Sequence, residues 1–171
     1  MRVLPSVVAP LVALAASAQP VLVDRIAAVV DGEPVFQSDV ERRASRDDPD
    51  AKAPQQRLRA LARARLDLID AKLIAKDFRV TPTDAEIDAA IDGVAKGAKL
   101  DRAALEAAVT RHGMSLAEYR EVLRSQLLEL RWLMTRSKER SVSISSDAER
   151  EALRTSLVVE LRKRAVIEVF E

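Results

Sequence analysis

The chain has 171 residues, of which 48% are hydrophobic and 32% charged, and its 28 basic side chains nearly balance 27 acidic ones. This composition indicates one folded domain with a buried core, and it excludes a disordered polymer and a nucleic-acid binder with a strongly basic face. The absence of cysteine and the single histidine exclude disulfides, thiolate nucleophiles and most metal sites. Four glycines, and no proline after Pro82, favour a mostly helical fold.

Residues 1–18 predict a secretory signal peptide. Arg2 precedes an uncharged apolar run, and the small residues Ala16 and Ala18 stand at the two positions that a signal peptidase recognises. An uncleaved membrane anchor or a buried first helix is the alternative, which two prolines within the run disfavour. Cleavage would leave residues 19–171 as an exported domain with no net charge and no stable membrane anchor, because Arg2 is the only charged residue lost.

Two apolar segments rich in β-branched residues predict a β-hairpin at the start of this domain. Residues 21–30 and 33–36 flank Asp31-Gly32, a pair that favours a tight turn between two strands. The only other strand-like segment, residues 165–170, lies at the far end of the chain. A lone strand cannot satisfy its own backbone, so we expect this segment to pair with the hairpin in one small antiparallel sheet. Such pairing would make residues 19–171 a closed unit.

The segments between these strands are predicted to be helical. Four S/T-x-x-E sequences, in which a hydroxyl and a carboxylate cap a helix reciprocally, predict helix starts at Ser38, Thr83, Ser115 and Ser146. Asp101 predicts a further helix that ends near Gly113, and a long helix is expected from about Gln56 to Phe78. The predicted fold class is therefore mainly α, a multi-helix domain whose small antiparallel sheet joins the hairpin to the last strand.

The helix that follows Ser115 carries more apolar residues than one face can hold. A heptad-like stripe along it consists of Leu116, Tyr119, Leu123, Leu127, Leu130 and Met134. Further apolar residues broaden the stripe, so more than one face must be covered. On or beside this helix, our candidates for a peptide-binding surface are Met114, Tyr119, Trp132 and Met134, because thioether and aromatic side chains suit adaptable apolar binding. The alternative is that each of them packs in the core.

The sequence assembles no catalytic, cofactor-binding or metal-binding site. His112 stands beside a predicted helix end, where a capping or surface role is expected rather than that of a general base. The chain contains no glycine-rich phosphate loop, no G-x-S-x-G turn and no H-E-x-x-H motif. Arg57, Arg59, Arg63 and Arg65 could bind an anion, but their spread around a helix favours a solvated surface.

Several segments, taken together, resemble the SurA-type periplasmic chaperones. In the order found in that family, the matching segments are residues 24–33, 38–40, 66–74, 80–88 and 113–120. The last of these fits a G-x-S-x-x-E-Y-R helix start, and residues 66–74 fit an L-x-x-L-I-D-x-K-L-I/L helix. The resemblance covers roughly residues 24–140, and residues 161–169 resemble the helix and strand that complete the family's core domain.

The resemblance implies an exported chaperone core domain, built from residues 24–140 and 146–171, that holds unfolded outer-membrane proteins without a cofactor. Full-length relatives carry parvulin-type prolyl isomerase domains between these two parts. Here only Ser141 to Ser146 separate them, too few for a domain of about a hundred residues, so no isomerase activity is expected. The alternative function is an exported assembly subunit or homodimer that binds a specific folded partner. A DNA-binding helical domain is a third reading, which needs a basic face that the sequence does not show.

Overall fold

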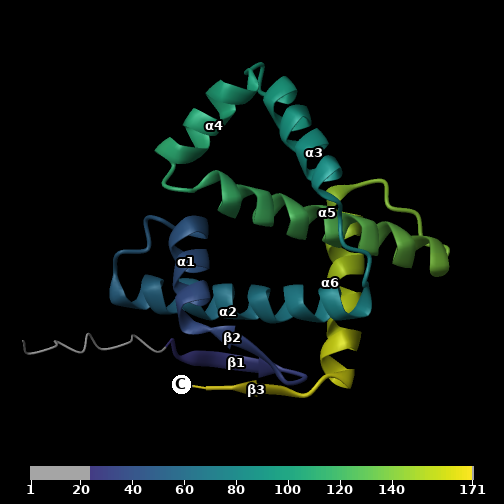
Figure 1. The fold of residues 1–171 in the computed structure, drawn as a ribbon. Coiled ribbons are helices and arrows are strands. Elements are labelled where there is room, and N and C mark those ends of the chain that lie inside the picture. Colours follow the sequence, from purple (N-terminus) through teal and green to yellow (C-terminus); the bar gives the residue numbers. More distant parts are fainter. Residues whose placement is uncertain (1–23, 171) are drawn as a thin grey trace, which may run out of the picture.

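The computed structural model describes residues 24–170, so the predicted signal peptide, with Ala16 and Ala18, lies outside the described residues. In the described part, two strands open the chain, six helices follow, and a third strand closes it (Figure 1). The elements are β1 (Ile26–Val30), β2 (Glu33–Phe36), α1 (Gln37–Asp47), α2 (Pro54–Asp77), α3 (Asp84–Gly97), α4 (Arg102–Arg111), α5 (Leu116–Glu139), α6 (Asp147–Arg164) and β3 (Ile167–Val169). The predicted mainly α class with a small antiparallel sheet is confirmed.

The sheet has the strand order β2-β1-β3, with both pairings antiparallel. Asp31 and Gly32 form the β1–β2 turn with φ angles of 49° and 88°, which these two residue types tolerate well. β3 pairs with β1 so that Ala28 lies opposite Val169. At the other end of the same pairing, the Asp31 amide donates to the Val166 carbonyl over 2.8 Å. The predicted pairing of the hairpin with the far strand is confirmed.

The main core lies between this sheet and α2, which crosses over it (Figure 1). Its buried side chains come from the sheet (Ala27, Ala28, Val30, Val35), from α1 (Val40, Ala44) and from α2 (Ala60, Ala64, Ile69, Leu73). α2 begins at Pro54, two residues before the predicted start, because proline is favoured in the first turn of a helix, where its missing N–H leaves no intrahelical bond unmade.

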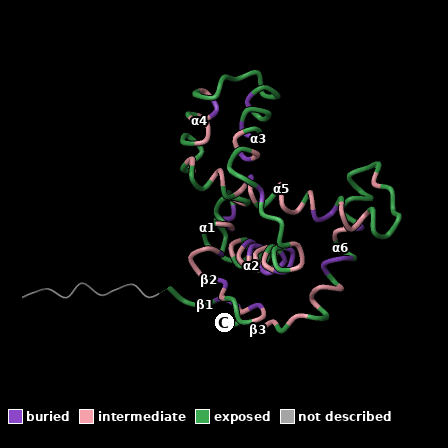
Figure 2. Tube along the Cα trace, turned by 45° about the vertical axis from the view of Figure 1, so that its right-hand side comes forward, coloured by how far each residue is buried: buried purple, intermediate pink, exposed green. Residues whose placement is uncertain are grey.

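Two further apolar clusters lie on different parts of α5. Its first half packs against α3 and α4 through Ile87, Ile91, Ala95, Leu105 and Leu123. Its second half packs against α2 and α6 through Ile74, Trp132, Leu133, Leu153, Leu157 and Val158. The buried residues of α3 and α4 lie where these helices face each other (Figure 2). The prediction that more than one face of this helix is covered is therefore confirmed.

Three of the four predicted capping boxes are present. In each box the cap hydroxyl accepts from the amide of the glutamate, and the glutamate carboxylate accepts from the cap amide. The three pairs are Thr83 with Glu86, Ser115 with Glu118 and Ser146 with Glu149. The fifth predicted start is confirmed too, since the Asp101 carboxylate accepts from the Ala104 amide over 2.7 Å.

The capping box predicted at Ser38 is wrong. α1 begins one residue earlier, at Gln37, with Phe36 as its N-cap residue and no side-chain cap of its own. The Ser38 hydroxyl donates instead to the Asp24 carboxylate, which also accepts from the Ser38 amide over 3.2 Å. A carboxylate fourteen residues upstream therefore satisfies an unpaired N–H in the first turn of α1.

Candidate functional site

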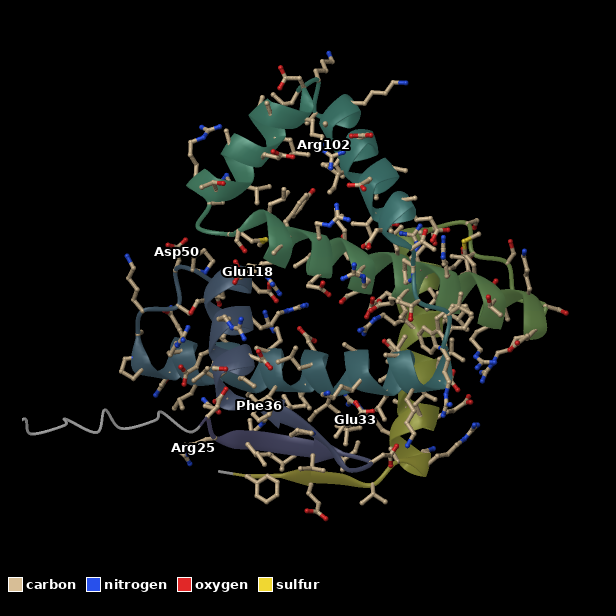
Figure 3. The ribbon with its side chains drawn as sticks, in the orientation of Figure 1. Arg25, Glu33, Phe36, Asp50, Arg102 and Glu118 are labelled. Atoms are coloured by element: carbon tan, nitrogen blue, oxygen red, sulfur yellow. The ribbon has the colours of Figure 1, made fainter. Side chains whose placement is uncertain are left out.

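An open cleft of about 1540 Å³ separates α1 and α2 from α5. The α4–α5 turn and the beginning of α6 complete its lining. Figure 3 shows Glu118 at the end of α5 that lies nearest α1, and this glutamate belongs to the lining. Ordinary small-molecule sites occupy about 300–1,000 Å³ and enclose most of the ligand, so a larger open cleft suits a stretch of polypeptide better.

Two helices supply the apolar floor of the cleft. On α2, Ala71 and Ala75 are exposed one turn apart, and Leu68 is half-buried beside them. On α5, Val122 is half-buried and Leu130 is 46% exposed. These positions lie three to eight residues apart on each helix, so they recur on one side of it. The fold thus leaves an apolar surface uncovered inside the cleft.

Charged side chains of both signs line the cleft beside these apolar positions. The lining includes six arginines and seven carboxylates, so the cleft has little net charge to select one kind of client. Hydrogen bonds from the Ser115 hydroxyl and amide lower the pKa of Glu118, and the charges of Arg42 and Arg46 add to this effect from α1. The basic side of α1 and the acidic start of α5 therefore face each other across the cleft.

The position of α5 is fixed at both ends of the cleft. Toward α3, Arg120 pairs with Asp88 over 2.6 Å and Arg124 with Asp84 over 2.9 Å. Toward the end of α2, the Trp132 indole and the Arg136 guanidinium donate to Asp77 Oδ2 over 2.7 and 2.8 Å. α2 and α5 consequently meet at their C-terminal ends and stand apart elsewhere.

The four residues proposed from sequence for peptide binding do not lie together. Met114 lines the cleft, whereas Tyr119 is half-buried against the cluster of α3 and α4. Met134 is 52% exposed but lies outside the cleft lining. Trp132 has no exposed surface, and its indole is bonded to Asp77, so here it is a packing residue.

Sequence reasoning missed most of the cleft floor, which consists of Leu68, Ala71, Ala75, Val122 and Leu130. Ala71 and Ala75 are each followed by a lysine, Lys72 and Lys76. Short side chains next to lysines do not stand out as an apolar surface in the sequence. A search for apolar residues that lie outside the heptad-like stripe of α5 would have included Val122. The pattern alone does not say which of two helix faces remains uncovered, because that depends on the packing of α3 and α4.

The described residues show no sign of a metal centre. Within residues 24–170, no three or more His, Asp or Glu side chains are grouped so that they could hold an ion. His112 is exposed and forms the C-cap of α4 at the rim of the cleft, where the helix dipole favours such a side chain. The same part of the chain contains no helix with the length and hydropathy needed to span a bilayer.

Comparisons with known proteins identify the family. The model of the SurA N-terminal domain matches residues 23–132. A solved structure from Campylobacter jejuni, from work on the SurA-like chaperones PEB4 and Cj1289, is 21% identical with a TM-score of 0.47 and covers 67% of this chain. The chain spans 42% of that neighbour's length, and curated proteins give no significant match. Because the family model covers more than half of its residues, the chain belongs to the SurA N-terminal domain family.

Proposed function

We propose that the protein is a periplasmic chaperone that holds unfolded polypeptides, outer-membrane proteins in transit among them, in the cleft between α2 and α5. Membership of the SurA N-terminal domain family supports a chaperone role, and the predicted signal peptide at residues 1–18 supports export. The observation that carries the proposal is the apolar floor left uncovered inside an open cleft of about 1540 Å³.

Binding in this cleft rests on contact and needs no chemical step. Burial of apolar client side chains against Leu68, Val122 and Leu130 contributes roughly 25 cal/mol for each Å² removed from water. The charged side chains that line the cleft are largely paired within the protein, as Arg154 is with Glu129 over 2.7 Å. They therefore attract no single charge pattern in a client. Such binding is tolerant of sequence and weak at each contact, which allows a client to be released for folding.

The residues first proposed from sequence have three different roles in such binding. Met114 is a direct client contact, because it lines the cleft and its flexible thioether adapts to different partners. Tyr119 and Trp132 act indirectly by fixing α5 against its neighbours. Met134 lies outside the lining and contacts only clients that extend past the end of the cleft.

The test is aggregation of an unfolded outer-membrane protein, followed by light scattering. The wild-type chain at stoichiometric amounts is expected to suppress scattering. Leu130→Glu places a charge on the cleft floor and is expected to abolish most of this suppression, whereas Val159→Glu on α6 should not. The two positions are matched, with exposed fractions of 46% and 43%, and Val159 lies outside the cleft lining. Unchanged scattering with the wild-type chain, or equal loss in both variants, contradicts the proposal.

We further propose that the described residues catalyse no prolyl isomerisation. α5 ends at Glu139 and α6 begins at Asp147, and the short connection between them holds no isomerase domain. A peptidyl-prolyl exchange assay should therefore give the uncatalysed rate at every concentration of protein. A rate that rises with protein concentration contradicts this proposal.

A further inference from the structure

The first half of α2 carries an unusual concentration of positive charge. Residues 54–66 contain Arg57, Arg59, Arg63 and Arg65 and no acidic residue, although the whole chain is almost neutral. Two of these arginines have partners, since Arg57 donates to the Ser45 hydroxyl and Arg65 to the Phe170 carbonyl over 3.3 Å. Arg59 and Arg63 are exposed and form no ion pair or hydrogen bond within residues 24–170.

An apolar stripe on the same helix runs beside these two arginines. Leu58, Ala62 and Leu66 follow one another at intervals of four residues, and all three are exposed, Leu58 by 66% and Leu66 by 48%. Further along the helix, Ile69 and Leu73 continue the stripe and are buried in the main core. One amphipathic face of α2 is therefore covered over its second half and open over its first half.

We propose that this open face of α2, defined by Leu58, Arg59, Ala62, Arg63 and Leu66, docks on the surface of an anionic phospholipid bilayer. Guanidinium groups pair with phosphate oxygens, and a leucine stripe beside them enters the boundary between headgroups and acyl chains. The proposal concerns peripheral binding and is independent of the client cleft. Such binding keeps the protein at the surface of a membrane from which clients emerge or into which they insert.

Shape and charge favour a lipid surface over an acidic protein. The outward side of a helix is convex, so a deformable bilayer can cover it without a matching groove. The carboxylates that precede α2 lie in the loop from α1, where Figure 3 places Asp50, and not among the residues of the open face. Beside the helix, Phe170 is 45% exposed and its carbonyl is bonded to Arg65, so it adds an aromatic side chain at the edge of the proposed contact.

The experiment measures sedimentation of the protein with vesicles of phosphatidylcholine, with and without phosphatidylglycerol. The wild-type chain should bind only the vesicles with phosphatidylglycerol, and added salt should release it. R59E/R63E should weaken binding by about tenfold or more, because each basic residue near an anionic surface contributes about 1 kcal/mol. All proteins compared share the same N-terminus, so any contribution of residues 1–23 is constant.

Two matched controls separate the open face from general effects. K96E/R111E reverses two exposed charges on α3 and α4, and should bind as the wild type does. L58A/L66A should weaken binding without a change in charge, whereas V94A/V159A, which shortens two other exposed apolar side chains, should not. Client holding by R59E/R63E should remain at the wild-type level, which also shows that this variant is folded.

Four outcomes of the vesicle experiments overturn the proposal. These are no binding of the wild type to phosphatidylglycerol vesicles, equal binding to pure phosphatidylcholine, wild-type binding by R59E/R63E, and an equal loss in K96E/R111E. Binding to polyglutamate in place of the vesicles also overturns it, because that result assigns the face to acidic proteins. The failure of this proposal is distinct from failure of the holding function, which the scattering assay measures separately.

Discussion

At the scale of single residues, Asp70 is the charged side chain that the fold buries most completely within residues 24–170, with 4% of its surface exposed. Arg162 of α6 donates to it over 2.8 Å, and so the pair joins α2 to α6. Burial raises the pKa of Asp70 above its usual value, although the hydrogen bond and charge of Arg162 act in the opposite direction. The folded protein therefore binds this proton more tightly than the unfolded chain does.

Arg162→Ala is expected to reduce the free energy of unfolding by about 2 kcal/mol at neutral pH, because it leaves a buried carboxylate without its cation. The direction in which stability changes with pH follows from the raised pKa of Asp70. Ionisation of Asp70 disfavours folding, so stability linked to this group is greatest at low pH and is lost as pH rises through the folded pKa. Denaturant unfolding should show the deficit of Arg162→Ala shrinking as the pH is lowered.

Asp70→Asn in the Arg162→Ala background provides the control. It removes the charge that Arg162 compensated, and most of the lost stability at neutral pH should return. A deficit of Arg162→Ala that is independent of pH, or that the second substitution does not relieve, would assign the effect to lost packing of the arginine side chain instead.

At the scale of elements, the helix starts show what a local sequence pattern can predict. The boxes at Thr83, Ser115 and Ser146 involve residues three apart, so the sequence contains everything that forms them. Ser38 has the same local pattern, but Asp24 lies close enough in the folded chain to bind its hydroxyl and amide. A pattern of four residues carries no information about such a distant competitor.

The cap of α3 is also a contact between elements. Glu86 accepts from the Thr83 amide over 2.8 Å and pairs with Arg131 of α5. Hydrogen bonds from Arg131, and then from Thr83, lower the pKa of Glu86 to about 2. The charged form therefore favours folding, and this contribution is present above the ordinary glutamate pKa and lost as pH falls toward 2.

Glu86→Gln is expected to lower the thermal midpoint at neutral pH, because the amide carries no charge for Arg131. The difference from the wild type should narrow as the pH falls from about 4.5 toward 2, since Glu86 takes up its proton near 4.5 in the unfolded chain but only near 2 in the folded protein. Thermal melts followed by circular dichroism at several pH values measure this. A difference that stays constant across the range would mean that the charge of Glu86 does not act through this pair.

At the scale of the whole molecule, α5 bridges two groups of helices, and the cleft exists because it contacts α2 at one end only. The sequence was sufficient to predict the hairpin, its pairing with β3 and the double-sided burial of α5, because each follows from backbone satisfaction or apolar excess. It was not sufficient to separate Trp132, which is buried, from Leu130, which is 46% exposed, since both belong to one apolar helix. Only the placement of α2, α3 and α6 around α5 decides which of them remains open.

Site-specific photo-crosslinking of an unfolded outer-membrane protein to this chain tests most directly whether clients bind in the cleft. A crosslinking side chain is introduced singly at Ala71 or Leu130 on the cleft floor, and at Val159 as the matched exposed position outside it. If clients are held between α2 and α5, crosslinks form from Ala71 and Leu130 and remain at background from Val159. Equal crosslinking from all three positions, or crosslinking from Val159 alone, would contradict the cleft as the client-binding site.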